Sequence, residues 1–215
     1  MPNATNPIKA VIFDLDGVLV DAREWHYEAL NRALNLFGFN IQRYDHLTTF
    51  DGLPTREKLA RLQVTDGLPE KLCRIVDVLK QDYTREIIST KCFPVFHIEN
   101  TLARLRRDGY QLAACTNSIR DSLDLMLSRS NLTDYFELTL SNEDVKNSKP
   151  DPEIYEKAMA ELGRTAEECV VVEDNQHGIQ AAQSAGAHVL QVENPSGVQY
   201  GSISSRILEL RDSNT

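Results

Sequence analysis

The sequence lacks the features that mark membrane proteins, secreted proteins and nucleic-acid-binding proteins. No apolar run approaches the length of a membrane span, and the opening residues MPNATNPIKA contain no apolar core of a signal peptide. Positive charge is scarce, since 23 Lys and Arg stand against 32 Asp and Glu, and the net charge is −9. A chain this acidic offers no basic footprint for nucleic-acid phosphates. We therefore expect a cytoplasmic protein with neither a membrane nor a nucleic-acid partner.

Cysteine is also scarce, and the four cysteines form no CxxC pair (Cys73, Cys92, Cys115 and Cys169). This scatter is typical of small buried apolar residues in a reducing compartment, not of a zinc site or a disulfide frame. With 41% hydrophobic and 26% charged residues, the composition is that of an ordinary globular protein. Its 215 residues suffice for one large domain, or for a core domain with a smaller inserted one.

The most informative stretch is AVIFDLDGVLVD, residues 10–21. The apolar, β-branched residues 8–13 have no helical period, which predicts a strand buried on both faces of a parallel sheet. Asp14 and Asp16 follow at once, and Gly17 permits a sharp turn. Open α/β sheets bind ligands at this carboxyl edge, and two carboxylates so close together favour a Mg²⁺ ion between them. The alternative is an ordinary acidic turn.

Residues 22–92 show helical periods and no convincing strand, which predicts a small helical domain inserted after the first strand. The expected helices cover residues 25–37, 55–62 and 69–88. The core domain would then consist of residues 1–21 and 93–215, with hinges at Val20 to Arg23 and at Lys91 to Pro94. The alternative is that these helices simply pack on the sheet.

From Ile98 onward the pattern alternates between helix and strand, as in a doubly wound α/β fold. The expected strands are residues 111–115, 136–140, 169–172 and 188–192, and the helices between them are 98–107, 120–130, 151–162 and 179–185. Right-handed crossovers make all strands parallel and bring their carboxyl ends to one edge. A short apolar pattern, Ile203 to Leu210, is expected to pack on the sheet.

Further polar residues follow the later strands of this predicted sheet. Thr116 offers a hydroxyl beside backbone N–H groups at a helix start, which suits a phosphate. Lys149 offers a cation in the rigid NSKPDP loop, and Glu173 and Asp174 add a second acidic pair. Each has an ordinary alternative as a helix cap, a solvated lysine or a turn. Their meeting at one edge of the sheet favours phosphoryl chemistry.

Four motifs stand in order along nearly the whole chain: FDLDGVLVD, CTNS, SKPDPEIY and VVEDNQHGIQAAQSAG. In order and spacing they resemble the motifs of the haloacid dehalogenase-like (HAD) hydrolase superfamily. The helical insert resembles the C1 cap of the subgroup that contains phosphoglycolate phosphatase-like and beta-phosphoglucomutase-like enzymes. The resemblance implies an α/β fold with a doubly wound, parallel-sheet (Rossmann-like) core and a small helical cap domain.

The resemblance also implies a role for each core residue. Asp14 would be the nucleophile that takes the phosphoryl group as an aspartyl-phosphate, and Asp16 would be the general acid and base. Thr116 and Lys149 would hold the phosphate oxygens. Mg²⁺ would bind to carboxylates and to a backbone carbonyl of Asp16. The implied metal-binding residues are Asp14, Asp16, Glu173 and Asp174.

Substrate-binding residues are implied both in the core and in the insert. These are Asn117, His26, Gly52, Thr55 and Arg56. His26 stands where beta-phosphoglucomutase-like proteins carry a cap histidine, but related phosphatases often share it. The alternatives are a hinge-side helix residue for His26 and an ordinary helix-surface residue for Arg56.

Asp16 bears on the reaction, because family members that cleave carbon–halogen or carbon–phosphorus bonds usually lack this second aspartate. We expect a Mg²⁺-dependent phosphatase of a small phosphorylated metabolite, a sugar phosphate or a phosphoglycolate-like acid. One alternative is a hexose phosphomutase that returns the phosphoryl group to a sugar. Another is a non-catalytic binding module, which the complete set of core residues disfavours. Both a monomer and a homodimer are compatible with the sequence.

Overall fold

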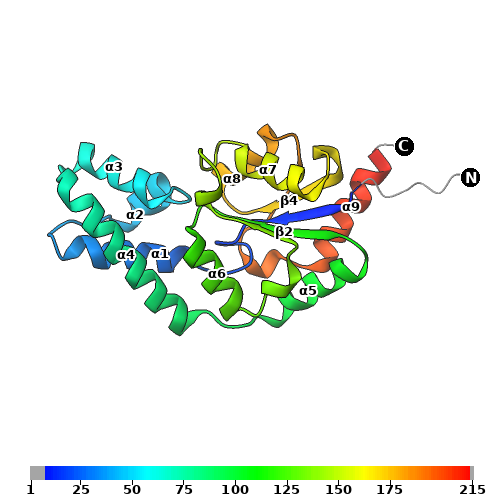
Figure 1. The fold of residues 1–215 in the computed structure, drawn as a ribbon, viewed down its shortest axis with the longest axis horizontal. Helices are drawn as coiled ribbons and strands as arrows, with labels where there is room; N and C mark the ends of the chain where they lie inside the picture. The colour runs from blue at the N-terminus through cyan, green and yellow to red at the C-terminus, as the bar shows by residue number, and fades with distance from the viewer. Residues whose placement is uncertain (1–7, 214–215) are drawn as a thin grey trace, which may run out of the picture. The chain divides into compact units, whose positions relative to one another are not determined.

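The computed structural model describes residues 8–213, and Figure 1 shows its ribbon. The chain divides into two compact units. The core unit contains the residues up to Asp21 and those from Phe93 onward, and the helical unit is Ala22–Cys92. No helix among the residues 8–213 combines the length and apolar character needed to cross a membrane.

The core unit contains a five-stranded parallel sheet in the order β3-β2-β1-β4-β5. Its strands are β1 (Ala10–Phe13), β2 (Gln111–Cys115), β3 (Leu138–Leu140), β4 (Cys169–Glu173) and β5 (His188–Gln191). β1 and β4 are buried along their whole length, as their continuous apolar runs predicted. The expected doubly wound α/β fold is confirmed.

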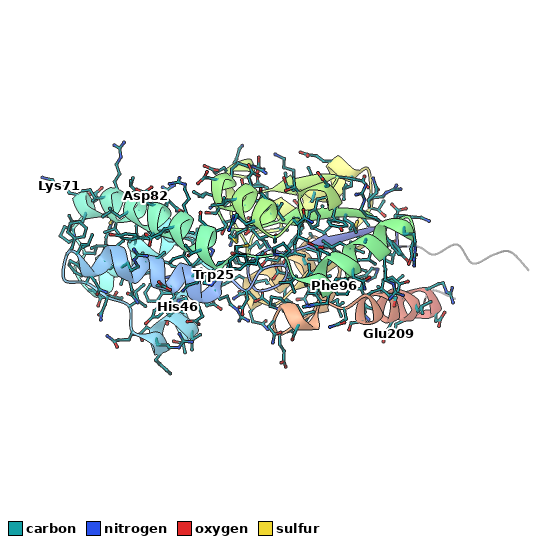
Figure 2. The ribbon with its side chains drawn as sticks, turned by 90° about the horizontal axis from the view of Figure 1, so that it is seen from below. Trp25, His46, Lys71, Asp82, Phe96 and Glu209 are labelled. Atoms are coloured by element: carbon teal, nitrogen blue, oxygen red, sulfur yellow. The ribbon has the colours of Figure 1, made fainter. Side chains whose placement is uncertain are left out.

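Helices cover both faces of this sheet. Figure 1 shows α5 (Phe96–Arg107) and α6 (Arg120–Arg129) on one face, and α7 (Glu153–Leu162) and α8 (Gln176–Ser184) on the other. The buried residues of α7 and α8 form one apolar cluster with alternate residues of β1, β2 and β4. The last helix, α9 (Tyr200–Ser213), carries Glu209 in Figure 2 and packs against α5.

Several boundaries in the core unit differ from the sequence-based expectation: α5 begins two residues early, at Phe96, and α7 begins two residues late, at Glu153. The β3 strand begins at Leu138 instead of residue 136, because Thr133–Tyr135 forms a 3-10 turn just before it. The α8 helix begins earlier, at Gln176, because the Asn175 side chain accepts a hydrogen bond from the backbone of His177 and caps the helix. The pattern that was expected between Ile203 and Leu210 extends into all of α9, in which Ile203, Ile207 and Leu210 are buried while Leu208 is exposed.

The helical unit contains α1 (Arg23–Asn35), α2 (Arg43–Asp45), the π-helical turn η1 (His46–Phe50), α3 (Thr55–Thr65) and α4 (Glu70–Lys91). Lys71 and Asp82 lie along α4 in Figure 2. The long helices α1 and α4 pack together around their own apolar cluster, and two exposed ion pairs, Arg32–Glu86 and Lys91–Glu28, join their polar sides. The α2 and η1 segment was not predicted, because it is short and buries only His46 and Phe50.

Candidate active site

The register of the sheet brings the carboxyl ends of three strands, β1, β2 and β4, to one edge. Phe13, the last residue of β1, lies level with Ala114 of β2 and Val172 of β4. The backbone N–H of Asp14 still donates to the Val172 carbonyl at 3.0 Å. The residues that follow these three strands therefore emerge beside one another, although they are distant in sequence.

Lys149 is the charged centre of this edge. Its side chain is buried, and Nζ donates hydrogen bonds to Asp14 Oδ1 at 2.7 Å, to Glu173 Oε1 at 2.7 Å and to the Cys115 carbonyl at 2.9 Å. An ammonium group has three N–H donors, so each of them has an acceptor here. Burial alone lowers the pKa of Lys149, but the two carboxylates outweigh burial and raise the pKa above its ordinary value. Lys149 is therefore a buried cation and not a solvated surface lysine.

Glu173 is as fully hydrogen-bonded as Lys149. Its Oε1 accepts from Lys149 Nζ and from the Tyr155 hydroxyl at 2.6 Å. Its Oε2 accepts from the backbone N–H groups of Asp174 and Asn175 at 3.1 and 3.3 Å. Tyr155 was missed by sequence reasoning, since it stands in SKPDPEIY as one more apolar position of a helix. Only the packing of α7 shows that its hydroxyl reaches this site.

A group of three carboxylates suits a divalent cation. Oxygens of Asp14, Glu173 and Asp174 all lie within 4.8 Å of one another. Burial raises the pKa of Asp14 well above its ordinary value, Lys149 lowers it, and Glu173 and Asp174 raise it further. Three carboxylates beside one ammonium carry an excess of negative charge, which a divalent cation would neutralise. A donor set made only of oxygens fits Mg²⁺. The side chain of Asp16 is not part of this group.

Asp16 lies in a different environment from Asp14. Its Oδ2 accepts hydrogen bonds from the hydroxyls of Thr116 at 3.0 Å and Ser118 at 2.8 Å. The Thr116 hydroxyl in turn accepts from the backbone N–H of Ser118 at 3.0 Å. One aspartate is thus paired with an ammonium and the other with two hydroxyls, so the two carboxylates have different surroundings. Ser118 was not among the predicted site residues, although it stands in the CTNS motif.

Asn117 braces the loop that carries Lys149. Its Oδ1 accepts from the backbone N–H of Lys149 at 3.0 Å, and its Nδ2 donates to the Lys149 carbonyl at 3.2 Å. Asn142 donates to the Asn117 carbonyl at 2.8 Å and ties a third segment to the pair. These bonds hold the loop in place. The substrate-binding role expected of Asn117 stays a prediction.

The other predicted substrate-binding residues belong to the helical unit. His26 Nδ1 lies 3.3 Å from Lys80 Nζ. Gly52 has a φ of 72°, a left-handed conformation that favours glycine. Thr55 begins α3, and Arg56 beside it is exposed. Their contact with a substrate stays a prediction.

Comparisons with known proteins agree with the motifs. The family model for haloacid dehalogenase-like hydrolases matches residues 11–192. The chain is 31% identical over 183 residues to a phosphorylated carbohydrates phosphatase of Thermotoga maritima, covering 83% of this chain and 82% of the relative. It is 29% identical over 219 residues to a phosphoglycolate phosphatase of Salmonella paratyphi A, covering 93% and 84%.

A solved structure shows the same fold over nearly the whole chain. A beta-phosphoglucomutase of Clostridium difficile superposes with a TM-score of 0.81 at 23% identity, covering 94% of this chain and 98% of that one. The chain belongs to the haloacid dehalogenase-like hydrolase family, and the resemblance drawn from its motifs is confirmed. Within this family it is an enzyme of the phosphatase class.

Proposed function

We propose that this protein is a Mg²⁺-dependent phosphatase that hydrolyses a small phosphorylated metabolite through an aspartyl-phosphate on Asp14. The observation that carries the proposal is the Lys149 ammonium, which is buried between Asp14 and Glu173 beside a cluster of carboxylate oxygens. The names of two relatives, a phosphorylated carbohydrates phosphatase and a phosphoglycolate phosphatase, support a sugar phosphate or a phosphoglycolate-like acid as substrate.

The metal would be held by the carboxylates of Asp14 and Asp174 and by the backbone carbonyl of Asp16, with Glu173 as a further ligand or a neighbouring carboxylate. When bound, Mg²⁺ supplies the positive charge that lets a carboxylate approach a phosphate dianion. Lys149 adds to this neutralisation from within the protein, because its ammonium already contacts Asp14.

In the first half of the reaction, an oxygen of Asp14 attacks phosphorus and forms a new P–O bond. The bond between phosphorus and the ester oxygen breaks, and Asp16 donates a proton to that leaving oxygen. Thr116 and Lys149 hold phosphate oxygens. In the second half, Asp16 takes a proton from water, the water oxygen attacks phosphorus, and the Asp14–phosphorus linkage breaks. Inorganic phosphate leaves, and both aspartates return to their starting states.

We assign the helical unit, residues 22–92, the role of a cap that contributes to substrate selection. Its candidate residues are His26, Gly52, Thr55 and Arg56. The core, residues 1–21 and 93–215, would carry the chemistry. A cytoplasmic location, and a monomer or a homodimer as the working form, stay predictions.

The test is phosphate release from a panel of phosphorylated sugars and small acids, with Mg²⁺ or with EDTA. We expect strong release from one or two compounds, loss of release in EDTA, and no isomerised sugar. Isomerisation that a sugar bisphosphate stimulates would show a phosphomutase instead. No release from any ester in Mg²⁺ would favour a non-catalytic module and overturn the proposal.

The metal site has its own test, which does not depend on turnover. Mg²⁺ that binds only the folded protein stabilises it by about 2.7 kcal/mol at 100 times its Kd, and this stabilisation raises the melting temperature. Asp174→Asn should remove most of this rise, while Asp134→Asn, which changes an exposed aspartate, should leave it intact. Equal rises in both variants would exclude Asp174 as a ligand.

A further inference from the structure

We propose that Tyr155 is a positioning residue of this active site: its hydroxyl fixes the Glu173 carboxylate, which in turn holds the Lys149 ammonium against Asp14. The inference rests on the proposed function, in which Asp14 and Lys149 meet the phosphoryl group. Tyr155 itself lies behind these residues and acts through them.

Tyr155 contacts both members of the ion pair. Its hydroxyl donates to Glu173 Oε1 at 2.6 Å, and Lys149 Nζ lies 4.7 Å from the centre of its ring. The side chain is 0% exposed and is anchored by α7, whose apolar face packs on the sheet. The hydroxyl of Tyr155 therefore fixes the position of the Glu173 carboxylate, and its ring contacts the Lys149 ammonium.

The hydrogen bonds of Glu173 hold its carboxylate in one orientation. Its two oxygens accept four hydrogen bonds: from Lys149 Nζ, the Tyr155 hydroxyl, and the N–H groups of Asp174 and Asn175. Removal of the hydroxyl leaves a buried carboxylate oxygen with Lys149 as its remaining donor among these four. The Glu173 carboxylate can make up for the lost hydrogen bond by turning toward the Lys149 ammonium or the metal site. Such a turn would shift the position of the Lys149 ammonium.

The first turn of the α8 helix also lies against Glu173. A Cβ atom at Gly178 would lie 1.7 Å from Glu173 Oε1, so the first turn of α8 approaches the carboxylate more closely than any other residue type permits. Glu173 is therefore confined by the backbone at Gly178 as well as by the hydroxyl of Tyr155. This confinement is what a carboxylate needs in order to act as a fixed support for a catalytic cation.

Tyr155 acts as a hydrogen-bond donor and not as an acid or a base. Burial, and after it the charges of Glu173 and Asp14, raise the pKa of Tyr155 well above its ordinary value. The phenol thus keeps its proton throughout the neutral range.

The test compares two Tyr→Phe variants that each lose one hydroxyl. Tyr155→Phe keeps the ring beside Lys149, and we expect kcat to fall about 10-fold with KM changed by less than about twofold. Tyr200→Phe is the control, since the Tyr200 hydroxyl also donates to a carboxylate, Asp108 Oδ2, at 2.6 Å, but at the opposite ends of the strands. Its kcat should stay within about twofold of the wild type.

A double-mutant comparison separates positioning from a general loss of structure. If Tyr155 acts through Glu173, Tyr155→Phe should cost less than about twofold in kcat when Glu173 is already Gln. Losses that multiply in the double variant would overturn the proposal. So would a kcat of Tyr155→Phe that matches the wild type.

A readout independent of turnover keeps this proposal distinct from the proposed function. The buried ammonium of Lys149 should give a protected signal in a lysine side-chain ¹H–¹⁵N spectrum, assigned by its loss in Lys149→Met. We expect this signal to shift or broaden in Tyr155→Phe and to stay unchanged in Tyr200→Phe. An unchanged signal in Tyr155→Phe overturns the positioning role, whereas an inactive wild-type protein with a shifted signal overturns only the proposed function.

Discussion

Lys149 Nζ lies 2.7 Å from Asp14 Oδ1, although 135 positions of sequence separate the two residues. The contact exists because β1 lies at the centre of the sheet and the loop before α7 returns to the same edge. Both side chains are nearly inaccessible to solvent, so their charges are weakly screened. Lys149 therefore lowers the pKa of Asp14, and Asp14 raises the pKa of Lys149.

Asp14→Asn should abolish turnover, with a loss of about 1000-fold or more, because the amide cannot attack phosphorus. The fold should persist, which circular dichroism and thermal melting would show. Asp124→Asn provides a matched control, since Asp124 is exposed and pairs only with Arg120 among the contacts of its carboxylate that the structure describes. Substantial activity in Asp14→Asn would remove this residue from the role of nucleophile.

Lys149→Met should destabilise the protein by about 3–5 kcal/mol when measured in EDTA, because two buried carboxylates lose their shared cation. The measurement is urea unfolding followed by circular dichroism. Lys157→Met should cost less, about 1–2 kcal/mol, because Lys157 is partly exposed, pairs loosely with Glu161 at 3.8 Å and donates one hydrogen bond to the Asp144 carbonyl at 2.8 Å. Equal losses in the two variants would contradict the burial argument.

Gly178→Ala should cost about 1–3 kcal/mol, because the new methyl group would overlap the Glu173 carboxylate. Gly201→Ala makes the same change in α9, where a Cβ meets nothing within 4 Å. That variant should be as stable as the wild type or more stable by up to about 1 kcal/mol, since alanine favours a helix. Thermal melting of the pair distinguishes steric overlap from the general effect of alanine. A Gly178→Ala protein that melts like Gly201→Ala would show that Glu173 can move.

Asp144→Asn should reduce stability in a pH-dependent way. Partial burial raises the pKa of Asp144, but hydrogen bonds from Ser141 and Arg120 outweigh burial and lower the pKa below its ordinary value. A lowered native-state pKa means that the ionised carboxylate stabilises the fold above an ordinary carboxyl pKa of about 4, and that this contribution is lost as the pH falls through the native value. We expect a loss of about 1 kcal/mol near neutral pH.

The difference in stability between Asp144→Asn and the wild type should begin to narrow below about pH 4, where the unfolded state binds a proton at Asp144 first. It should be lost once the pH falls below the lowered native pKa, because Asp144 is then protonated in both states. Urea unfolding across the acid range measures it. Asp134→Asn, which changes an exposed aspartate, serves as the control. A stability difference that stays constant with pH would mean that Asp144 acts through its shape and not its charge.

The sequence by itself determined the order of helices and strands in the core unit and the family of the chain. These features rest on local information: continuous apolar runs for strands buried on both faces, helical periods between them, and polar motifs directly after strand ends. The boundaries shifted where a cap or a turn intervened, as at Asn175 and at Thr133–Tyr135. The short α2 and η1 segment was missed because so little of it is buried.

Only the tertiary structure decided which partners the site residues have. Tyr155 looks like one more apolar position in its helix, and Ser118 like part of a helix start, yet their hydroxyls reach Glu173 and Asp16. Gly178 looks like an ordinary small residue until the Glu173 carboxylate is found against it. Such contacts join segments distant in sequence and depend on how helices pack and how side chains point. No local pattern encodes them, because the same residue types are equally compatible with other neighbours.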